Sequence, residues 1–259
     1  MLKSSKNIKS VLLVGGTSTI GLAIVRELAR HSELSKITLA GRQSQLLTET
    51  LDALQKEMPA TLVEFVEMDL TQTGTLFAKV QKVIQTTETD IVLMAAGVLP
   101  ANQGAIGQVL AAVKTNYLGP LEVCSQVIES FKSKGKGTLV VLSSVAATRP
   151  RSDNCLYGST KSGLDFWARG MAENLRGTAV HVMVVRPGMV ETKMSQGMGR
   201  APMTCLPEDV ALAVVAGLKK NSTVVWVPGK IKVLITLVNI LPLFLYRRLK
   251  VRKSSPTPL

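Results

Sequence analysis

The sequence predicts an α/β fold in which helices cover both faces of one parallel sheet of about seven strands, a doubly wound arrangement. Short runs of β-branched apolar residues alternate with helix-length segments along the chain. Most of these runs are apolar throughout, as expected for parallel strands that are buried on both faces. The 259 residues fit one domain of this kind, and 46% of them are hydrophobic, which is enough to fill a core.

The strands and helices can be placed in order from the spacing of apolar residues. The expected strands are Val11–Val14, Ile37–Ala40, Leu62–Met68, Ile91–Ala95, Thr138–Leu142, Val180–Val185 and Val224–Val227. Segments such as Ile20–Arg30 and Leu164–Leu175 carry apolar residues at helical spacing. Periodicity lapses over residues 189–205, and Pro207 then opens another helix.

The net charge of +13 is concentrated at the two ends of the chain. Residues 230–259 contain seven basic residues and no acidic ones, and three lysines lie among the first nine residues. Residues 10–229 are close to charge balance, which argues against a nucleic-acid-binding face. We therefore divide the chain into a domain over residues 1–229 and an apolar, basic extension over residues 230–259.

The three cysteines fit neither a disulfide framework nor the spacing of metal ligands, so we expect a reducing compartment and no metal site. The first strand begins close to the N-terminus, which leaves no room for a cleavable signal peptide. These two observations predict a cytoplasmic location.

A glycine-rich turn joins the first expected strand to the first helix. Residues 14–21 read Val-Gly-Gly-Thr-Ser-Thr-Ile-Gly, in the strand-turn-helix context of a Rossmann-type dinucleotide fingerprint. N–H groups at the start of the helix can face a pyrophosphate; the alternative is an ordinary tight turn. The cofactor-binding residues expected in this turn are Gly15, Thr17, Ser18, Thr19, Ile20 and Gly21.

The ends of the next two strands bear on cofactor preference. The second strand ends in Arg42, without the acidic residue that would bind the ribose hydroxyls of NAD. A guanidinium there can pair with a 2′-phosphate, which favours NADPH over NADH; the alternative is a solvated loop arginine. Asp69, just past the third strand, is positioned to bind the adenine amino group or to cap the next helix.

Tyr157 and Lys161 are four residues apart, so on a helix they share one face. A phenol has a pKa near 10, and bringing it to neutrality takes roughly 4 kcal/mol of differential stabilisation. A desolvated lysine and a bound nicotinamide cation could supply this together. Ser144 and Asn116 lie upstream. Taken singly, Lys161 could be a surface ion-pair partner, Ser144 a strand-end cap and Asn116 a polar helix residue.

With these motifs in this order, residues 8–228 closely resemble the classical short-chain dehydrogenase/reductase family. The matching positions are Gly15, Gly21, Asp69, Ala95-Ala96-Gly97, Asn116, Ser144, Tyr157, Lys161, Arg186-Pro187-Gly188 and Thr192. The resemblance implies that Tyr157 donates a proton to a substrate carbonyl, that Ser144 holds the carbonyl oxygen and that Lys161 binds the nicotinamide ribose and lowers the phenol pKa. It implies that Asn116 holds a water linking Lys161 to solvent.

The same resemblance extends the expected cofactor site. The further cofactor contacts it implies are Ala96, Gly97, Tyr157, Lys161, Pro187, Gly188, Val190 and Thr192. It also implies that the methionine-rich stretch after residue 188 covers the substrate. Two positions depart from the family pattern: Thr19 replaces the middle glycine of the phosphate turn, and Ala95 replaces an asparagine. The turn keeps its N–H groups, so binding is expected in spite of Thr19.

Residues 231–246 are nearly all apolar and are followed by a cluster of arginines and lysines. The run is shorter than the roughly 20 apolar residues of a spanning helix, and Pro242 interrupts it. A helix lying in the membrane interface, with basic residues on anionic headgroups, fits this pattern. A helix in a homo-oligomer interface and a lid over the active site are the alternatives.

More narrowly, the chain resembles the branch of that family that reduces a 2-keto pentose on a polyprenyl phosphate, the decaprenylphosphoryl-2-keto-pentose reductases. The shared features are the Gly-Gly-Thr-Ser-x-Ile-Gly turn, Tyr-Gly-Ser-Thr-Lys, Val-Arg-Pro-Gly-x-Val, the Trp-x-Pro strand end and the apolar, basic C-terminus. This resemblance implies a flavin-dependent oxidase partner, a product used in cell-wall arabinan synthesis, and a site on the inner face of the cell membrane. The alternatives are a reductase of another hydrophobic ketone, such as a fatty-acyl or sterol-like one, and a non-catalytic dinucleotide-binding regulator.

Overall fold

The computed structural model describes residues 8–101, 105–199, 201 and 203–240. Seven parallel strands form one sheet in the order β3-β2-β1-β4-β5-β6-β7. The strands are β1 (Ser10–Val14), β2 (Lys36–Gly41), β3 (Leu62–Glu67), β4 (Ile91–Met94), β5 (Gly137–Leu142), β6 (Val180–Pro187) and β7 (Val224–Val227). All seven predicted strands are confirmed to within two residues at each end.

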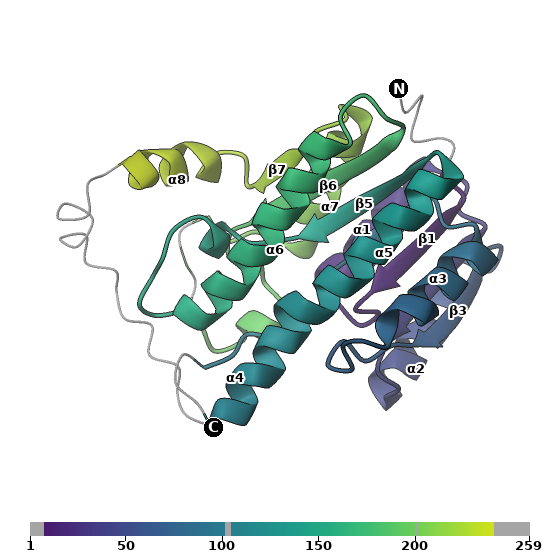
Figure 1. The fold of residues 1–259 in the computed structure, drawn as a ribbon, viewed down its shortest axis with the longest axis horizontal. Coiled ribbons are helices and arrows are strands. Elements are labelled where there is room, and N and C mark those ends of the chain that lie inside the picture. Colours follow the sequence, from purple (N-terminus) through teal and green to yellow (C-terminus); the bar gives the residue numbers. More distant parts are fainter. Residues whose placement is uncertain (1–7, 102–104, 200, 202, 241–259) are drawn as a thin grey trace.

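Helices cover both faces of the sheet, as the sequence predicts (Figure 1). They are α1 (Thr19–His31), α2 (Gln45–Glu57), α3 (Leu76–Thr87), α4 (Ile106–Val113), α5 (Gly119–Lys134), α6 (Cys155–Asn174), α7 (Pro207–Lys219) and α8 (Ile231–Ile240). A π-helical turn, Lys114–Leu118, joins α4 to α5. Helix α6 contains Tyr157 and Lys161 as well as most of the predicted helical segment Leu164–Leu175, although residues 155–163 carry few apolar side chains to reveal a helix.

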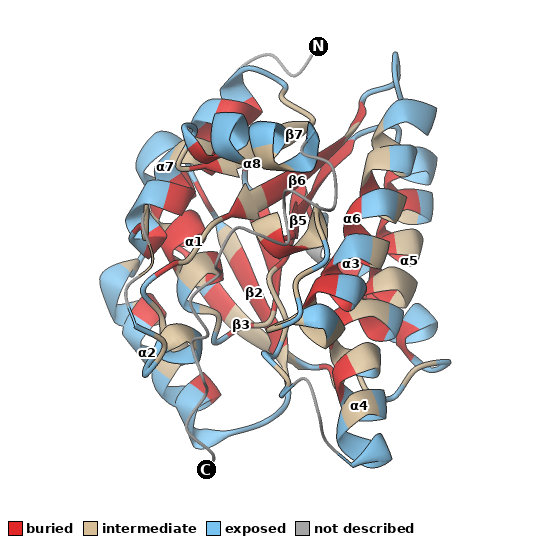
Figure 2. Cartoon of the chain, turned by 90° about the vertical axis from the view of Figure 1, so that its left-hand side faces the viewer, coloured by how far each residue is buried: buried red, intermediate tan, exposed pale blue. Residues whose placement is uncertain are grey.

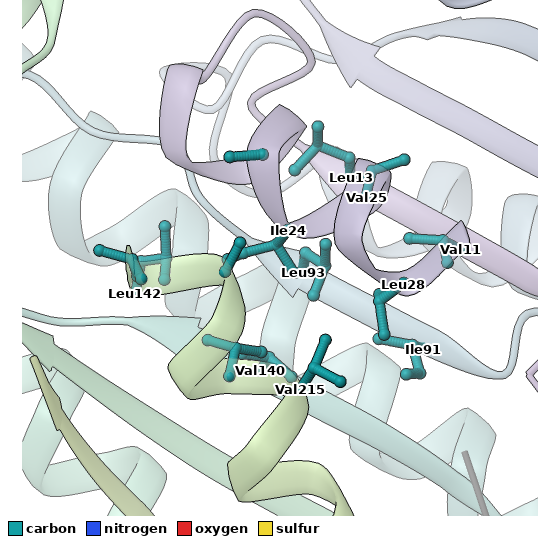
Figure 3. Close-up of a cluster of buried hydrophobic side chains, with 14 of the residues drawn as sticks. Val11, Leu13, Ile24, Val25, Leu28, Ile91, Leu93, Val140, Leu142 and Val215 are labelled. Carbon is teal, nitrogen blue, oxygen red and sulfur yellow. The ribbon is translucent and has the colours of Figure 1, made fainter. Parts of the chain in front are cut away.

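Two hydrophobic clusters hold the layers together, one on each face of the sheet. Alternate residues of β1 belong to different clusters. Leu13 packs toward α1 and α7, and Leu12 packs toward α3, α5 and α6. Figure 3 shows part of the first cluster, in which Leu13, Ile24 and Val215 are among the labelled side chains. The central strands β1, β4 and β5 are buried along their whole length (Figure 2), which explains why their sequences are apolar throughout.

The chain order in the sheet reverses between β1 and β4. In open parallel sheets a ligand crevice forms at such a switch point, outside the carboxyl ends of the strands. The glycine turn after β1 and residues 95–97 after β4 lie side by side there, since Val14 pairs with Met94.

The C-terminal extension is described only as far as Ile240, so residues 241–246 of the predicted apolar run and the basic cluster after it lie outside the described residues. Helix α8 projects beyond the end of β7 (Figure 1). Within the described part of the chain, no helix is both long enough and apolar enough to cross a membrane.

Candidate active site

The turn after β1 depends on a glycine at its first position. Gly15 has φ +94°, and its N–H and that of Gly16 donate to the carbonyl of Ala40 at 2.8 and 2.9 Å. A Cβ on Gly15 would lie 2.7 Å from the backbone nitrogen of Ala96. The two strand ends of the switch point therefore approach too closely for any side chain at this position.

Helix α1 starts directly after the turn. The Ser18 hydroxyl caps it by accepting from the Gly21 N–H at 3.2 Å. Thr19 is the first helical residue and its side chain is exposed, so the departure from the family glycine leaves the helix start intact. Thr17 is exposed and Ile20 half-buried beside it. Because the first N–H groups of a helix lack intrahelical partners, this end can receive an anion.

Ala95, which stands where the family has an asparagine, packs close to Gly21 of α1. A Cβ on Gly21 would lie 2.5 Å from Leu13 Cδ1 and 3.0 Å from the Cβ of Ala95. Ala95 thus lies beneath the phosphate turn, and its N–H donates to the Val14 carbonyl at 2.9 Å. A small residue at position 95 fills this space against α1.

Arg42 and Asp69 lie at the ends of β2 and β3, as predicted. Arg42 is exposed, and its positive charge is among the causes that lower the pKa of Asp69. The largest cause is the hydrogen bond from the Thr71 N–H, which donates to Asp69 Oδ1 at 2.9 Å, as the Thr71 hydroxyl does. Asp69 therefore closes the turn after β3 and does not cap α3, whose N-cap residue is Thr75, so the capping alternative is wrong. The predicted adenine contact stays a prediction.

Asn116 is fully buried in the π-helical turn. Its Oδ1 accepts from the Val98 N–H at 2.7 Å, and its Nδ2 donates to the Val98 carbonyl at 2.9 Å. Such π-turns are frequent at functional sites. Here the turn directs an amide toward the segment that follows β4, so Asn116 is not an ordinary exposed helix residue.

Lys161 is also buried, which excludes the surface ion-pair alternative. Its Nζ donates to the Leu142 carbonyl at 3.0 Å. A Cβ on Gly97 would lie 3.2 Å from this Nζ and 3.4 Å from Asn116 Oδ1, so Gly97 leaves room for both polar groups. Burial lowers the pKa of Lys161 to about 8, and the ammonium still predominates at pH 7.

The Ser144 hydroxyl lies close enough to the Tyr157 phenol to favour its ionised form. The Ser144 Oγ also accepts from the Ala146 N–H at 3.1 Å, so the serine caps the turn after β5 as well. Burial raises the pKa of Tyr157 and the nearby Ser144 hydroxyl opposes this. The Lys161 Nζ lies 6.0 Å from the centroid of the Tyr157 ring. With protein groups alone burial prevails, and the lowered phenol pKa remains a prediction for the cofactor-bound state.

Three of the expected cofactor contacts, Gly188, Val190 and Thr192, lie in the segment that follows β6. The Gly188 N–H donates to the Val227 carbonyl at 2.8 Å, and Val190 is buried. The N–H of Thr192 donates to Ser195 Oγ at 3.0 Å. A hollow of about 390 Å³ opens beside this segment, and its lining residues are Met189, Glu191, Ser195, Gly197, Met198, Gly199 and Thr204. Two of the predicted substrate-covering methionines thus line a hollow next to Gly188.

The structure brings the four predicted catalytic residues together from three separate parts of the chain. Asn116 comes from the π-helical turn, Ser144 from the end of β5, and Tyr157 and Lys161 from α6. Sequence reasoning missed a buried carboxylate on the same helix, Asp165, which binds side chains from the strand ends. Its spacing of four residues from Lys161 was the available signal.

Sequence comparison identifies relatives along most of the chain. The profile of the family described as short chain dehydrogenase matches residues 9–202. An uncharacterized oxidoreductase in the mprA 5′ region of Streptomyces coelicolor is 38% identical over 250 residues, which cover 94% of this chain and 96% of the relative. An uncharacterized oxidoreductase of Mycobacterium tuberculosis is 33% identical over 244 residues, 92% of this chain and 96% of that one.

Solved structures share the fold at lower identity. A short-chain dehydrogenase from Sphingobium yanoikuyae in complex with NADPH superposes with a TM-score of 0.76 at 21% identity, over 91% of this chain and 97% of that one. A gluconate 5-dehydrogenase from Burkholderia cenocepacia in complex with NADP and tartrate gives 0.74 at 17% identity, over 88% and 97% of the two chains. The sheet, the ordered motifs and the matched profile lead to one conclusion: this chain belongs to the short-chain dehydrogenase family and is an oxidoreductase.

Proposed function

We propose that this protein reduces a ketone to a secondary alcohol, with NADPH as the preferred reductant. The observation that carries the proposal is the convergence of Tyr157, Ser144, Lys161 and Asn116 at the carboxyl end of the sheet, beside the glycine turn. A phenol with a hydroxyl partner and a buried ammonium nearby is suited to transferring a proton to a carbonyl oxygen.

The residues of the turn fit a dinucleotide. Gly15 lets the turn approach the backbone of Ala96, and the start of α1 has N–H groups that can bind a pyrophosphate. When bound there, the cofactor supplies the hydride. Arg42 is placed to pair with a 2′-phosphate, which supports NADPH over NADH.

Each catalytic side chain then has a role that its surroundings support. Tyr157 donates its proton to the substrate oxygen, and Ser144, whose hydroxyl lies beside that phenol, orients the oxygen. Lys161 is anchored to the Leu142 carbonyl and binds the ribose hydroxyls of the nicotinamide half. Asn116, held by the Val98 backbone, supports the water path by which a proton reaches Lys161.

For the substrate we propose the 2-keto group of a polyprenylphosphoryl pentose, reduced to the arabino product for cell-wall arabinan synthesis. The resemblance of the subfamily motifs motivates this choice, and the apolar surface of α8 supports a lipid-linked molecule. Val233, Leu237 and Ile240 of α8 are 64, 61 and 74% exposed. Arg149, in the loop between Ser144 and α6, donates to the Val238 carbonyl, so α8 lies next to the loop that joins Ser144 to Tyr157.

The partners and the location follow from this substrate. A flavin-dependent oxidase would supply the keto intermediate, and α8 with the basic residues after it would hold the protein on the inner face of the cell membrane. A homo-oligomer is compatible with this arrangement. The second candidate is reduction of another hydrophobic ketone, because a ketoacyl reductase from Nostoc is 28% identical over 83% of this chain.

Oxidation of NADPH in the presence of candidate ketones tests the substrate. The purified protein is mixed with detergent-solubilised polyprenylphosphoryl 2-keto pentose, made by a flavin-dependent oxidase, and separately with a β-ketoacyl thioester. Faster turnover of the keto sugar lipid supports the proposal, whereas turnover of the thioester alone replaces it with the second candidate. Cofactor binding without turnover of any ketone would point to a regulator.

Membrane attachment has its own test. The full chain and a variant lacking residues 231–259 are sedimented with vesicles containing anionic phospholipid. We expect the full chain to pellet and the truncated one to stay in the supernatant. Equal sedimentation of both would show that α8 and the tail are not the anchor.

A further inference from the structure

Asp165 continues the face of α6 that carries the two predicted catalytic side chains. It lies four residues after Lys161 and eight after Tyr157, and positions at this spacing share one face of a helix. Only 2% of its surface is exposed. The family reaction gives this carboxylate no role, and a buried carboxylate needs partners to offset its lost hydration.

Those partners come from the ends of two strands. Ser143, directly after β5, donates its hydroxyl to Asp165 Oδ2 at 2.6 Å. Arg186, near the end of β6, forms a two-point pair, from Nε to Oδ2 at 2.9 Å and from Nη2 to Oδ1 at 2.6 Å. The Arg186 guanidinium also lies 4.8 Å from the ring centroid of Trp226 on β7. The Asp165 carboxylate thus ties α6 to the ends of β5 and β6, and Arg186 extends this contact to β7.

Arg169 completes the set from the solvent side. It donates from Nε to Asp165 Oδ1 at 2.9 Å, and its own side chain is 43% exposed. Burial opposes ionisation of Asp165, but the hydrogen bonds and charge of Arg186, with the bonds from Ser143 and Arg169, outweigh it and lower the pKa of Asp165. Buried ion pairs add little net stability, so this one calls for another explanation.

The partners of Asp165 are the sequence neighbours of the catalytic groups. Ser143 immediately precedes Ser144, and Arg186 immediately precedes Pro187 and Gly188 on the nicotinamide side. The Ser143 N–H donates to the Val185 carbonyl at 2.8 Å, which joins the two strand ends. A shift of α6 relative to these ends would change the distance from the Tyr157 phenol to Ser144.

We infer that Asp165 is a positioning residue that fixes α6 against the ends of β5 and β6, and so sets the Tyr157–Ser144 geometry. The inference rests on the proposed ketone reduction but not on any particular ketone. A displacement of about 1 Å in an active site can lower turnover on the order of 100-fold. Asp165 touches neither substrate nor cofactor in this role, so it acts through turnover and not through binding.

Ser143→Ala and Arg169→Ala form a matched pair of tests, since each removes one hydrogen bond to the same carboxylate. They are assayed with whichever ketone the wild-type protein reduces fastest, so a wrong substrate proposal does not affect the result. We expect Ser143→Ala to lower kcat about tenfold with KM unchanged, and Arg169→Ala to change kcat less than twofold. Equal effects of the two variants would overturn the inference.

Asp165→Asn leaves Arg186 without its buried counter-charge and can weaken folding itself. The double variant Asp165→Asn with Arg186→Met removes both charges, and we expect its thermal unfolding midpoint to return to within a few degrees of wild type. The affinity for NADPH, followed by fluorescence titration, should stay within about threefold of wild type, because the phosphate turn is untouched. We expect kcat of the double variant to stay 10- to 100-fold below that of wild type. Recovery of both kcat and the unfolding midpoint would show that Asp165 has a purely structural role.

Discussion

The turn after β1 and the segment around Ser144 lie at the same end of the sheet but are built from different groups. The turn uses backbone N–H groups and a helix start, and its Thr17 and Thr19 side chains are exposed. The catalytic region uses buried side chains, with Asn116 and Lys161 each fixed by hydrogen bonds to the backbone. We therefore expect the backbone site to tolerate new side chains where they point outward, and the proposed catalytic site to depend on each side chain it holds.

Tyr157→Phe should produce the largest effect. It removes the proton donor but keeps the ring, so we expect kcat to fall at least about 1,000-fold, within the range that a general acid contributes. NADPH oxidation measures kcat, and NADPH binding by fluorescence should be unchanged. Turnover close to wild type would show that Tyr157 is not the proton donor.

Gly15→Ala tests the turn after β1 at a position where the structure leaves no room for a side chain. The new Cβ would meet the backbone of Ala96 and would hold φ in the left-handed region, so we expect NADPH affinity to fall roughly 100-fold. Gly177→Ala is the matched control: it has φ +85° with no atom within 4 Å of the added Cβ. The control should lose only stability, and an equal loss of NADPH affinity there would mean that folding, not the turn, explains the first result.

Lys161→Met should stabilise the cofactor-free protein at pH 7 while lowering turnover. Burial lowers the pKa of Lys161 to about 8, so below that pH the native state holds a poorly hydrated ammonium. At about 1.4 kcal/mol for each unit of pKa, less the lost bond to the Leu142 carbonyl, we expect a net gain of about 2 kcal/mol in the free energy of unfolding.

The stability of the wild-type protein should depend on pH through Lys161. The unfolded chain binds the lysine proton more tightly than the native state, so wild-type stability rises with pH between about 8 and the unfolded pKa near 10.5. The advantage of Lys161→Met should therefore shrink across this window. Denaturant unfolding at pH 7 and pH 10 measures it, and a variant less stable than wild type at pH 7 would contradict the prediction.

Arg42→Ala should weaken NADPH binding about tenfold and leave NADH binding unchanged. An exposed arginine that pairs with a 2′-phosphate contributes one charge-assisted contact, in the range of 1.5–3 kcal/mol before solvent screening lowers it. Michaelis constants for the two cofactors measure the ratio. If both change equally, the arginine supports the loop and does not select the phosphate.

Thr19→Gly should have the smallest effect. The Thr19 side chain is exposed at the first residue of α1, so restoring the family glycine should change NADPH affinity less than about twofold and lower stability by less than about 1 kcal/mol. A tenfold gain in affinity would show that the side chain at position 19 does affect the phosphate geometry. The turn after β1 would then depend on one of its side chains, as the region around Ser144 is proposed to do.

The sequence predicted every strand of the sheet because central parallel strands must be apolar on both faces, and this leaves a clear pattern. It also predicted the glycine turn and the catalytic spacing, since both are short-range patterns along one segment. It did not show where α6 begins, because the first turns of this helix face the site and carry few apolar residues.

The sequence alone therefore determined the sheet, the turn and the identity of the four side chains proposed for catalysis. Only the tertiary structure showed how they meet: that a π-helical turn aims Asn116 at Val98, that Lys161 reaches the Leu142 carbonyl, and that the carboxylate of Asp165 joins α6 to the strand ends. These contacts join residues far apart in the chain, and no local pattern records which distant backbone atom a buried polar group will find. The physical reason is that burial forces each polar group to find a partner, and the fold supplies that partner.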